Sequence, residues 1–316
     1  MTTSKPIGLL LMAYGSPGDL SQMEDYLLDV RSGTPPSPEL VEEITERYRK
    51  IGGKSPLLDK TTEQSLTLEK ELNKRSPASG ANFKAFVGMR HWEPRISKAV
   101  KQMAEAGIQR AVAIVMAPHS SSMSTGKYYQ ALDEALQGYA IDFVRVQGWH
   151  KHPGLLEAIA EKMVIGFEAF KGRIPFVIFT AHSLPAAILE TGDPYEIQLQ
   201  ETARLLAERL DLREGSWQFS FQSAGAKAIP WLGPQIQDVV AELAQRGEKD
   251  LLVVPIGFVC DHVEVLYDID IEARQIAEQN GARLERTHSL NASPTFIRTL
   301  ADLVEEHLGR KLVKTG

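Results

Sequence analysis

Three carboxylates spaced four residues apart, Glu264, Asp268 and Glu272, form the pattern in this chain that most suggests chemistry. Carboxylates at this spacing share one side of a helix and repel each other, at a cost of about 0.2–0.5 kcal/mol per pair. A regular α-helix would let the row drift around its axis, whereas a π-type widening, which is frequent at functional sites, would keep it in line. The row follows the apolar stretch Leu251–Ile256, and open α/β sheets bind ligands beyond the carboxyl ends of their strands. We therefore interpret it as a row that handles cations, against the alternative of a solvated acidic face.

A histidine, His182, ends a second apolar stretch, Phe176–Ala181, and a turn containing Gly192-Asp-Pro-Tyr195 follows it. A neutral imidazole can accept a proton or bind a borderline metal ion such as Fe²⁺. A histidine at the end of a strand can equally well form hydrogen bonds to the backbone only. The residues alone leave both interpretations open.

The composition narrows the class of protein. The chain has 316 residues, 43% of them apolar and 24% charged, which is typical of a globular protein long enough for two cores. Its net charge of −6 argues against nucleic-acid binding. The single cysteine, Cys260, excludes a disulfide framework, a four-cysteine zinc site and an all-cysteine iron–sulfur cluster. Ile7–Ala13 is too short to cross a membrane and lacks the charged region and cleavage site of a signal peptide. We therefore expect a soluble, cytoplasmic protein without a transmembrane segment.

Apolar stretches that end in Gly or Pro alternate with helical patterns along the chain, which indicates parallel sheets flanked by helices. The expected strands are Ile7–Tyr14, Phe83–Gly88, Ala111–Ala117, Ile141–Gln147, Phe176–Ala181, Trp217–Gln222 and Leu251–Gly257. The expected helices are Pro38–Ile51, Thr61–Lys74, Glu93–Gly107, Lys127–Gly138, His152–Phe170, Pro194–Leu210, Pro234–Gly247 and Pro294–Leu312.

The chain also repeats itself. The helical pattern Pro94–Gly107 and the strand after it recur at Pro234–Gly247, with Pro near the first turn and Gly at the end, where both residues are favoured. The two sets of apolar residues are in phase. We therefore predict an α/β protein of two similar Rossmann-like domains, each a parallel sheet flanked by helices, with a cleft between them. The predicted parts are 1–150, 151–290 and 291–316, the last being a helix that packs back on the first half.

Five segments, taken in order along nearly the whole chain, resemble the ferrochelatase family. They are Met12-Ala-Tyr-Gly-Ser-Pro17, Arg47-Tyr-Arg-Lys-Ile-Gly-Gly-Lys-Ser-Pro-Leu57, Ile178-Phe-Thr-Ala-His-Ser-Leu-Pro185 with Gly192-Asp-Pro-Tyr195, Trp231-Leu-Gly-Pro234, and Gly257-Phe-Val-Cys-Asp-His-Val-Glu264 with Asp268. Ferrochelatases insert Fe²⁺ into a porphyrin during haem synthesis. The resemblance implies that Fe²⁺ is a substrate and that no cofactor is required.

The resemblance assigns roles that the residues alone left open. It implies that His182 is the base and a metal ligand, and that Glu264 faces it across the cleft. Asp268 and Glu272 would then belong to the metal route. Asp261 and His262 would support Glu264, and His119 would be structural or supporting. The remaining histidines are expected on the surface or in loops; they are His91, His150, His152, His288 and His307.

The residues that match porphyrin-contacting positions of the family lie in the first half. They are Tyr14, Arg31, Arg47, Tyr48, Ser55 and Tyr128. Arg guanidinium groups suit the propionates of the substrate. Relatives of the monoderm type carry a Tyr at the position of Tyr14, where it can lie axial to the metal, and the chain lacks the carboxyl-terminal extension and cysteines that hold an iron–sulfur cluster in some relatives. Both features favour coproporphyrin III, which has four propionates, as the substrate.

Three other functions remain open. The first is insertion of Fe²⁺ into protoporphyrin IX, which uses the same chemistry. The second is a porphyrin or haem carrier without turnover, which would have no use for the acidic row. The third is a cobalt or nickel chelatase, whose members usually depart from the Arg47–Leu57 segment. We expect a monomer that binds porphyrin and ferrous iron, with at most a transient partner from haem synthesis and no nucleic acid.

Overall fold

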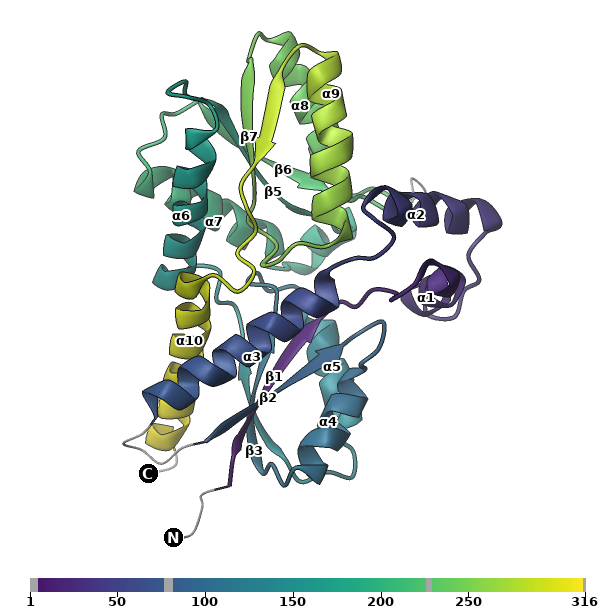
Figure 1. The fold of residues 1–316 in the computed structure, drawn as a ribbon, viewed down its shortest axis with the longest axis vertical. Helices are drawn as coiled ribbons and strands as arrows, with labels where there is room; N and C mark the ends of the chain where they lie inside the picture. The colour runs from purple at the N-terminus through teal and green to yellow at the C-terminus, as the bar shows by residue number, and fades with distance from the viewer. Residues whose placement is uncertain (1–4, 77–81, 226–228, 315–316) are drawn as a thin grey trace. The chain divides into compact units, whose positions relative to one another are not determined.

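The structure, a computed structural model, describes residues 5–76, 82–225 and 229–314 and divides into two compact units (Figure 1). The first unit comprises Met1–Ala117, Ser124–Trp149 and Asn291–Gly316, and the second comprises Pro118–Met123 and His150–Leu290. Each contains a four-stranded sheet whose neighbouring strands are all parallel. The α/β class predicted from the alternating patterns is therefore confirmed.

In the first unit the strands follow the order β2-β1-β3-β4. Helices α3 and α10 cover one face of this sheet, and α4 and α5 cover the other (Figure 1). Strand β1 is buried from Gly8 to Ala13, which explains its uninterrupted apolar sequence. A side chain at Gly8 would meet the Met103 side chain of α4, so glycine lets this helix approach the strand. The elements are β1 (Ile7–Ala13), η1 (Leu20–Gln22), α1 (Met23–Val30), α2 (Pro38–Lys50), α3 (Leu57–Arg75), β2 (Phe83–Met89), α4 (Ile96–Glu105), β3 (Arg110–Val115), α5 (Thr125–Ala135), β4 (Asp142–Val146) and α10 (Pro294–Lys314).

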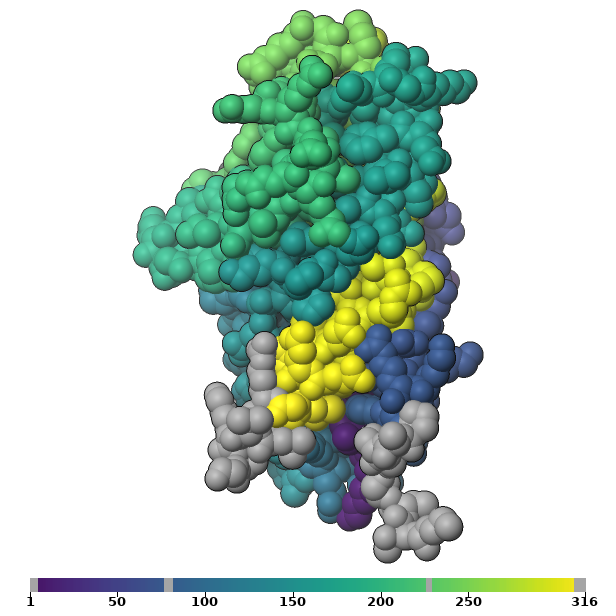
Figure 2. Space-filling model, turned by 90° about the vertical axis from the view of Figure 1, so that its left-hand side faces the viewer, coloured from purple at the N-terminus to yellow at the C-terminus, as the bar shows by residue number. Residues whose placement is uncertain are grey.

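Helix α10 lies beside α3 on the surface of the first unit, as the yellow and blue segments of Figure 2 show. Arg75 at the end of α3 joins the two helices, because its guanidinium lies 2.6 Å from Asp302 Oδ1 and 3.0 Å from Glu305 Oε2. The carboxyl-terminal helix thus completes the first sheet's outer layer although it follows the second unit in the chain.

In the second unit the strands follow the order β6-β5-β7-β8. One hydrophobic core joins β5 and β7 to α8 and to a π-helix, η3, which continues into α9. The elements are α6 (Pro153–Glu168), β5 (Phe176–His182), η2 (Ala186–Thr191), α7 (Tyr195–Arg209), β6 (Trp217–Gln222), α8 (Ile236–Gln245), β7 (Asp250–Pro255), η3 (Val265–Ala273), α9 (Arg274–Gln279) and β8 (Arg283–Arg286).

The internal repeat is present in the structure. Helix α4 and strand β3 have the same lengths as α8 and β7, which occur 140 residues later, and the two sheets have the same strand order. Gly107 and Gly247, just after the two helices, both have positive φ, as expected for glycine at a helix end. Pro94 and Pro234 lie two residues before the first helical residue, each after a cis peptide bond, which is near the first turn as expected.

Some elements were missed from the sequence. Helix α1 has apolar residues at Met23, Tyr26 and Leu27, which is a helical spacing, but it is only eight residues long. Strand β8 is a four-residue edge strand in which Leu284 alone is fully buried, so it gave no apolar stretch. In the described part of the chain, no helix combines the length and the hydropathy needed to cross a membrane.

Candidate functional site

His182 and Glu264 meet at one edge of the second sheet. Strands β5 and β7 are parallel neighbours, so their carboxyl ends lie at the same edge. His182 is the last residue of β5, and Glu264 lies in the first turn of the helix that follows β7. His182 Nε2 is 3.4 Å from Glu264 Oε1, and both side chains are about one third exposed. The sequence resemblance implied a pair facing across the cleft; the structure places both residues in contact within the second unit.

Hydrogen bonds orient both side chains of this pair. His182 Nδ1 donates to the carbonyl of Ser183, which leaves Nε2 facing Glu264. On the other side, His262 Nε2 lies 3.3 Å from Glu264 Oε2, and His262 Nδ1 donates to the Cys260 carbonyl at 3.1 Å. Each oxygen of Glu264 therefore faces an imidazole, and His262 lies in contact with the carboxylate that it was expected to support.

The electrostatics differ from the neutral imidazole assumed from the sequence. Burial alone would lower the pKa of His182, but the negative charge and hydrogen bond of Glu264 raise it to about 9. Burial would raise the pKa of Glu264, and the opposing effects of His182 and His262 hold it well below its ordinary value. At neutral pH the two groups therefore form an imidazolium–carboxylate pair. His182 must lose its proton before it can bind a metal ion or accept another proton.

The acidic row begins beside this pair and runs along the π-helix. Helix η3, which spans Val265–Ala273, is a π-helix, the kind of widening that would keep the carboxylates in one line. Asp268 is 3% exposed and accepts a hydrogen bond from Ser223 Oγ. Glu272 Oε2 accepts one from Gln237 Nε2 at 2.5 Å. The row is thus only partly solvated, and Asp268, expected at an outer station, is more buried than Glu264.

The carboxylates of the acidic row do not lie close enough together to bind one metal ion. Among the residues that the structure describes, no three His, Cys, Asp or Glu side chains are grouped so that they could hold one metal ion. This agrees with the spacing, because residues four apart rise about 6 Å along a helix. His182, Glu264, Asp268 and Glu272 therefore form a pair followed by two separate carboxylates.

The candidate porphyrin contacts lie in the first unit and differ in exposure. Tyr14 is 38% exposed, just after β1, and its ring lies 4.6 Å from the His91 ring. Arg31 is exposed at the end of α1, where its Nε donates to the Thr34 carbonyl. Arg47, on α2, forms an ion pair with Glu43 at 2.8 Å. Three further candidates are buried: Tyr48, Ser55 and Tyr128, whose ring lies 5.7 Å below the Arg90 guanidinium.

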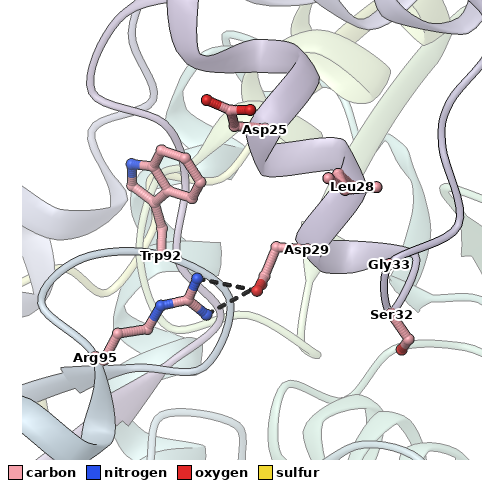
Figure 3. A pocket seen from close by; sticks show the side chains of 7 residues that line it. All are labelled: Asp25, Leu28, Asp29, Ser32, Gly33, Trp92 and Arg95. Carbon is pink, nitrogen blue, oxygen red and sulfur yellow. Dashed lines mark hydrogen bonds and ion pairs between the residues drawn. The ribbon is translucent and has the colours of Figure 1, made fainter.

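A pocket of about 460 Å³ in the first unit was missed from the sequence. It lies between helix α1 and the turn that leads from β2 to α4, and Trp92 and Arg95 form one wall (Figure 3). Arg95 forms hydrogen bonds with both oxygens of Asp29, at 2.9 and 3.1 Å. No local pattern could reveal this pair, because its members are 66 residues apart.

Two of the histidines expected on the surface or in loops lie in loops and are buried. His91 Nδ1 lies 3.0 Å from Asp29 Oδ2, in the same cluster as Arg95. His150 Nε2 lies 2.8 Å from Glu201 Oε2, and its ring is 5.7 Å from that of His119. His119 is itself 2% exposed, and its Nε2 lies 2.9 Å from Thr202 Oγ1. The loop positions agree with the expectation, but the burial was not foreseen, because solitary histidines carry no periodicity that shows which way they face.

Because His119 is buried, we expect the stability of the protein to depend on pH. Burial, and then the neighbouring His150, lower its pKa from 6.5 to about 3, so it is neutral in the folded protein. The unfolded chain takes up this proton below about pH 6.5, so the stability falls as the pH decreases from there towards 3. Between about pH 7.5 and 4.5 this loss is roughly 2–3 kcal/mol. Urea unfolding of His119→Gln should show a correspondingly flatter pH dependence of the free energy of unfolding. His288→Gln, at an exposed position, should keep the wild-type slope, and equal slopes in both variants would contradict this assignment.

Known proteins resemble this chain over almost its whole length. A family model described as Ferrochelatase matches residues 6–308. A protein from Deinococcus radiodurans named ferrochelatase is 44% identical over 311 residues, which cover 96% of this chain and 97% of that one. A protein from Oceanobacillus iheyensis named coproporphyrin III ferrochelatase is 40% identical over 304 residues, covering 95% and 96%. The solved structure of SirB from Bacillus subtilis with Fe³⁺ aligns with a TM-score of 0.58 at 10% identity, covering 96% and 95%, which shows a shared chelatase fold.

Proposed function

This chain belongs to the ferrochelatase family, and we propose that the porphyrin into which it inserts Fe²⁺ is coproporphyrin III. Family membership makes it an enzyme of haem synthesis, a lyase that acts on a porphyrin and ferrous iron. The observation that carries the site assignment is the contact between His182 and Glu264 at the carboxyl edge of the second sheet. Such an edge is where α/β sheets place reacting groups.

Insertion of Fe²⁺ requires that two pyrrole protons leave as the metal binds the four ring nitrogens. We assign His182 as the base and metal ligand, with Glu264 as its partner carboxylate. In the resting pair His182 holds a proton, and an approaching dication would favour its release because like charges repel. Asp268 and Glu272 lead away from this pair along η3 and are assigned to the route of the hydrated cation or of the released protons.

The substrate assignment depends on the charged side chains of the first unit. Arg31 and Arg47 are the proposed partners of propionates, because a guanidinium binds a carboxylate through two parallel hydrogen bonds. Tyr14 is the proposed axial group, with Tyr48, Ser55 and Tyr128 beside the ring. The relative from Oceanobacillus iheyensis bears the name of a coproporphyrin III enzyme, which supports this choice. The relative from Deinococcus radiodurans bears no substrate in its name, so protoporphyrin IX is the competing substrate.

A single cysteine, Cys260, is too few for a cluster held by cysteine thiolates, so we propose catalysis without an iron–sulfur cluster or another cofactor. We further propose a cytoplasmic monomer whose partners are the porphyrin, ferrous iron and at most a transient protein of haem synthesis.

The deciding experiment compares coproporphyrin III with protoporphyrin IX under anaerobic conditions. Purified protein, Fe²⁺ and each porphyrin are mixed, and the metalloporphyrin formed is followed by its absorbance. We expect a kcat/KM at least about tenfold higher for coproporphyrin III, which corresponds to about 1.4 kcal/mol of transition-state binding. A preference for protoporphyrin IX would overturn the substrate assignment. Binding of either porphyrin without metallation would instead indicate a carrier.

Substitution of the two arginines should weaken porphyrin binding more than it slows the chemistry. Loss of a charge-assisted hydrogen bond to a propionate should raise KM for coproporphyrin III by about tenfold or more in Arg31→Ala and Arg47→Ala. The kcat should stay within about twofold, because the metal-binding groups remain in place. Arg49→Ala is the matched control, since Arg49 lies on the same helix as Arg47 and pairs with Glu46. A large fall in kcat at unchanged KM in both arginine variants would remove them from propionate binding.

A further inference from the structure

The first residue of helix α7 is bonded to the backbone of His182. Tyr195 Oη donates a hydrogen bond to the His182 carbonyl at 2.9 Å. Tyr195 is 7% exposed, and burial raises the pKa of its hydroxyl, so the group stays protonated and donates. The mechanism assigned above makes no use of this tyrosine.

The peptide after His182 is held from several sides. Ser183 N donates to the Gln222 carbonyl at 2.7 Å, and Ser183 Oγ donates to the Leu232 carbonyl at 2.8 Å. The Ser183 carbonyl, in the next peptide unit, accepts the bond from His182 Nδ1. The backbone around Ser183 therefore sets the direction of the imidazole, and Tyr195 anchors the His182 carbonyl that precedes it.

Tyr195 is itself held by Asp193. Asp193 Oδ1 accepts from Tyr195 N at 3.1 Å, which caps the start of α7. Asp193 Oδ2 accepts from the backbone N and the Oγ of Ser122, both at 2.7 Å, and from Ser121 Oγ at 3.1 Å. Asp193 is 8% exposed, so these bonds are sheltered from water.

Ser121 and Ser122 belong to a segment that is hydrogen-bonded to one side of α7. Pro118–Met123 groups with the second unit although the residues on either side of it in sequence belong to the first. Ser120 N donates to Gln198 Oε1 at 2.7 Å, and His119 Nε2 lies 2.9 Å from Thr202 Oγ1. One turn of helix separates Gln198 from Thr202, so both lie on the same side of α7. The first two turns of α7 are thus hydrogen-bonded to the segment Pro118–Met123.

We infer that Tyr195 is a positioning residue for His182, and that Asp193 acts by holding Tyr195 in place. The inference depends on the proposed role of His182 in iron insertion. Without the hydroxyl, the 182–183 peptide has one anchor fewer, and the imidazole spends less time directed at Glu264. A reacting group displaced by about 1 Å can lose roughly a hundredfold in rate; loss of one anchor of several should cost roughly tenfold in kcat.

Tyr195→Phe tests this, with Tyr129→Phe as the matched control. Tyr129 is also 7% exposed and also donates its hydroxyl to a backbone carbonyl near a strand end, that of Val146, but it lies in the first unit. The melting temperature should fall by a similar amount in the two variants. Only Tyr195→Phe should lose kcat, by roughly tenfold with KM for the porphyrin unchanged. In the ligand-free protein, nuclear magnetic resonance should show the His182 Nδ1 proton exchanging faster in Tyr195→Phe than in wild type or Tyr129→Phe.

The exchange measurement separates failure of this inference from failure of the proposed function. If wild type inserts no iron, the proposed function fails, and the His182 Nδ1 proton still reports whether Tyr195 orients the ring. If the His182 Nδ1 proton exchanges at the same rate in Tyr195→Phe as in wild type, the inference is overturned, whatever happens to kcat. If Tyr195→Phe does not fold, Asp193→Asn replaces it: the asparagine keeps an acceptor for Tyr195 N but loses the charge that the serines bind. It should show the same changes to a smaller extent, and wild-type values of both kcat and proton exchange would overturn the inference.

Discussion

His182→Ala is expected to lower the rate of iron insertion by at least about a hundredfold, the lower end of what a positioned acid–base group supplies. The variant removes the proposed base and metal ligand at the edge of the second sheet. The fold should persist, because Glu264 keeps its contact with His262 Nε2 and is not left as an unpaired buried charge. Porphyrin binding should persist as well, since the proposed propionate partners are on other elements.

Three measurements check this expectation: the initial rate of metallation, the melting temperature, and the dissociation constant for coproporphyrin III from absorbance or fluorescence titration. His288→Ala is the control, because His288 is exposed and lies away from β5 in the sequence. Wild-type-like turnover by folded His182→Ala protein would remove His182 from the mechanism. A loss of porphyrin binding together with rate would reassign it to substrate binding.

Glu264→Gln and Glu272→Gln should both slow iron insertion, but with different dependences on Fe²⁺. Glutamine at position 264 can still donate an amide N–H to the Nε2 of a neutral histidine, but it has no charge to attract a cation or to stabilise a protonated His182. We expect a loss of about a hundredfold or more that added Fe²⁺ does not rescue.

Glu272 lies two turns further along the helix and accepts a bond from Gln237, which glutamine can also do. Its loss should slow the reaction a few-fold at limiting Fe²⁺ and be largely rescued at high Fe²⁺.

The rate as a function of Fe²⁺ concentration, together with the melting temperature, distinguishes a route from a merely acidic helix. Glu278→Gln is the control, because Glu278 is an exposed carboxylate on the continuation of the same helix. If the row is structural, Glu272→Gln relieves repulsion, melts slightly higher and metallates normally at every Fe²⁺ concentration. That result would exclude a cation route along the row. The role of Glu264 would then be judged from the Glu264→Gln variant alone.

The sequence by itself determined the elements and their order. Apolar stretches such as Ile7–Ala13 and Phe176–His182 became central strands, because a strand buried on both faces must be apolar throughout. The repeat of 140 residues predicted two sheets of like topology, and the structure has them. The spacing of Glu264, Asp268 and Glu272 indicated that a π-type widening would hold these carboxylates in one line, and the structure has a π-helix there. These features depend on residues close together in the chain, so local periodicity could reveal them.

The tertiary structure alone decided the environment of each charged group. The spacing of the row could not show that Asp268 is buried against Ser223, 45 residues away. Nor could the sequence show that the contact with Glu264 raises the pKa of His182 and so keeps it protonated. His91, Asp29 and Arg95 meet in one cluster that no local pattern records. The anchoring of His182 by Tyr195 is of the same kind. Burial and pKa depend on which distant side chains the fold brings within a few ångströms, and a single sequence does not state those pairings.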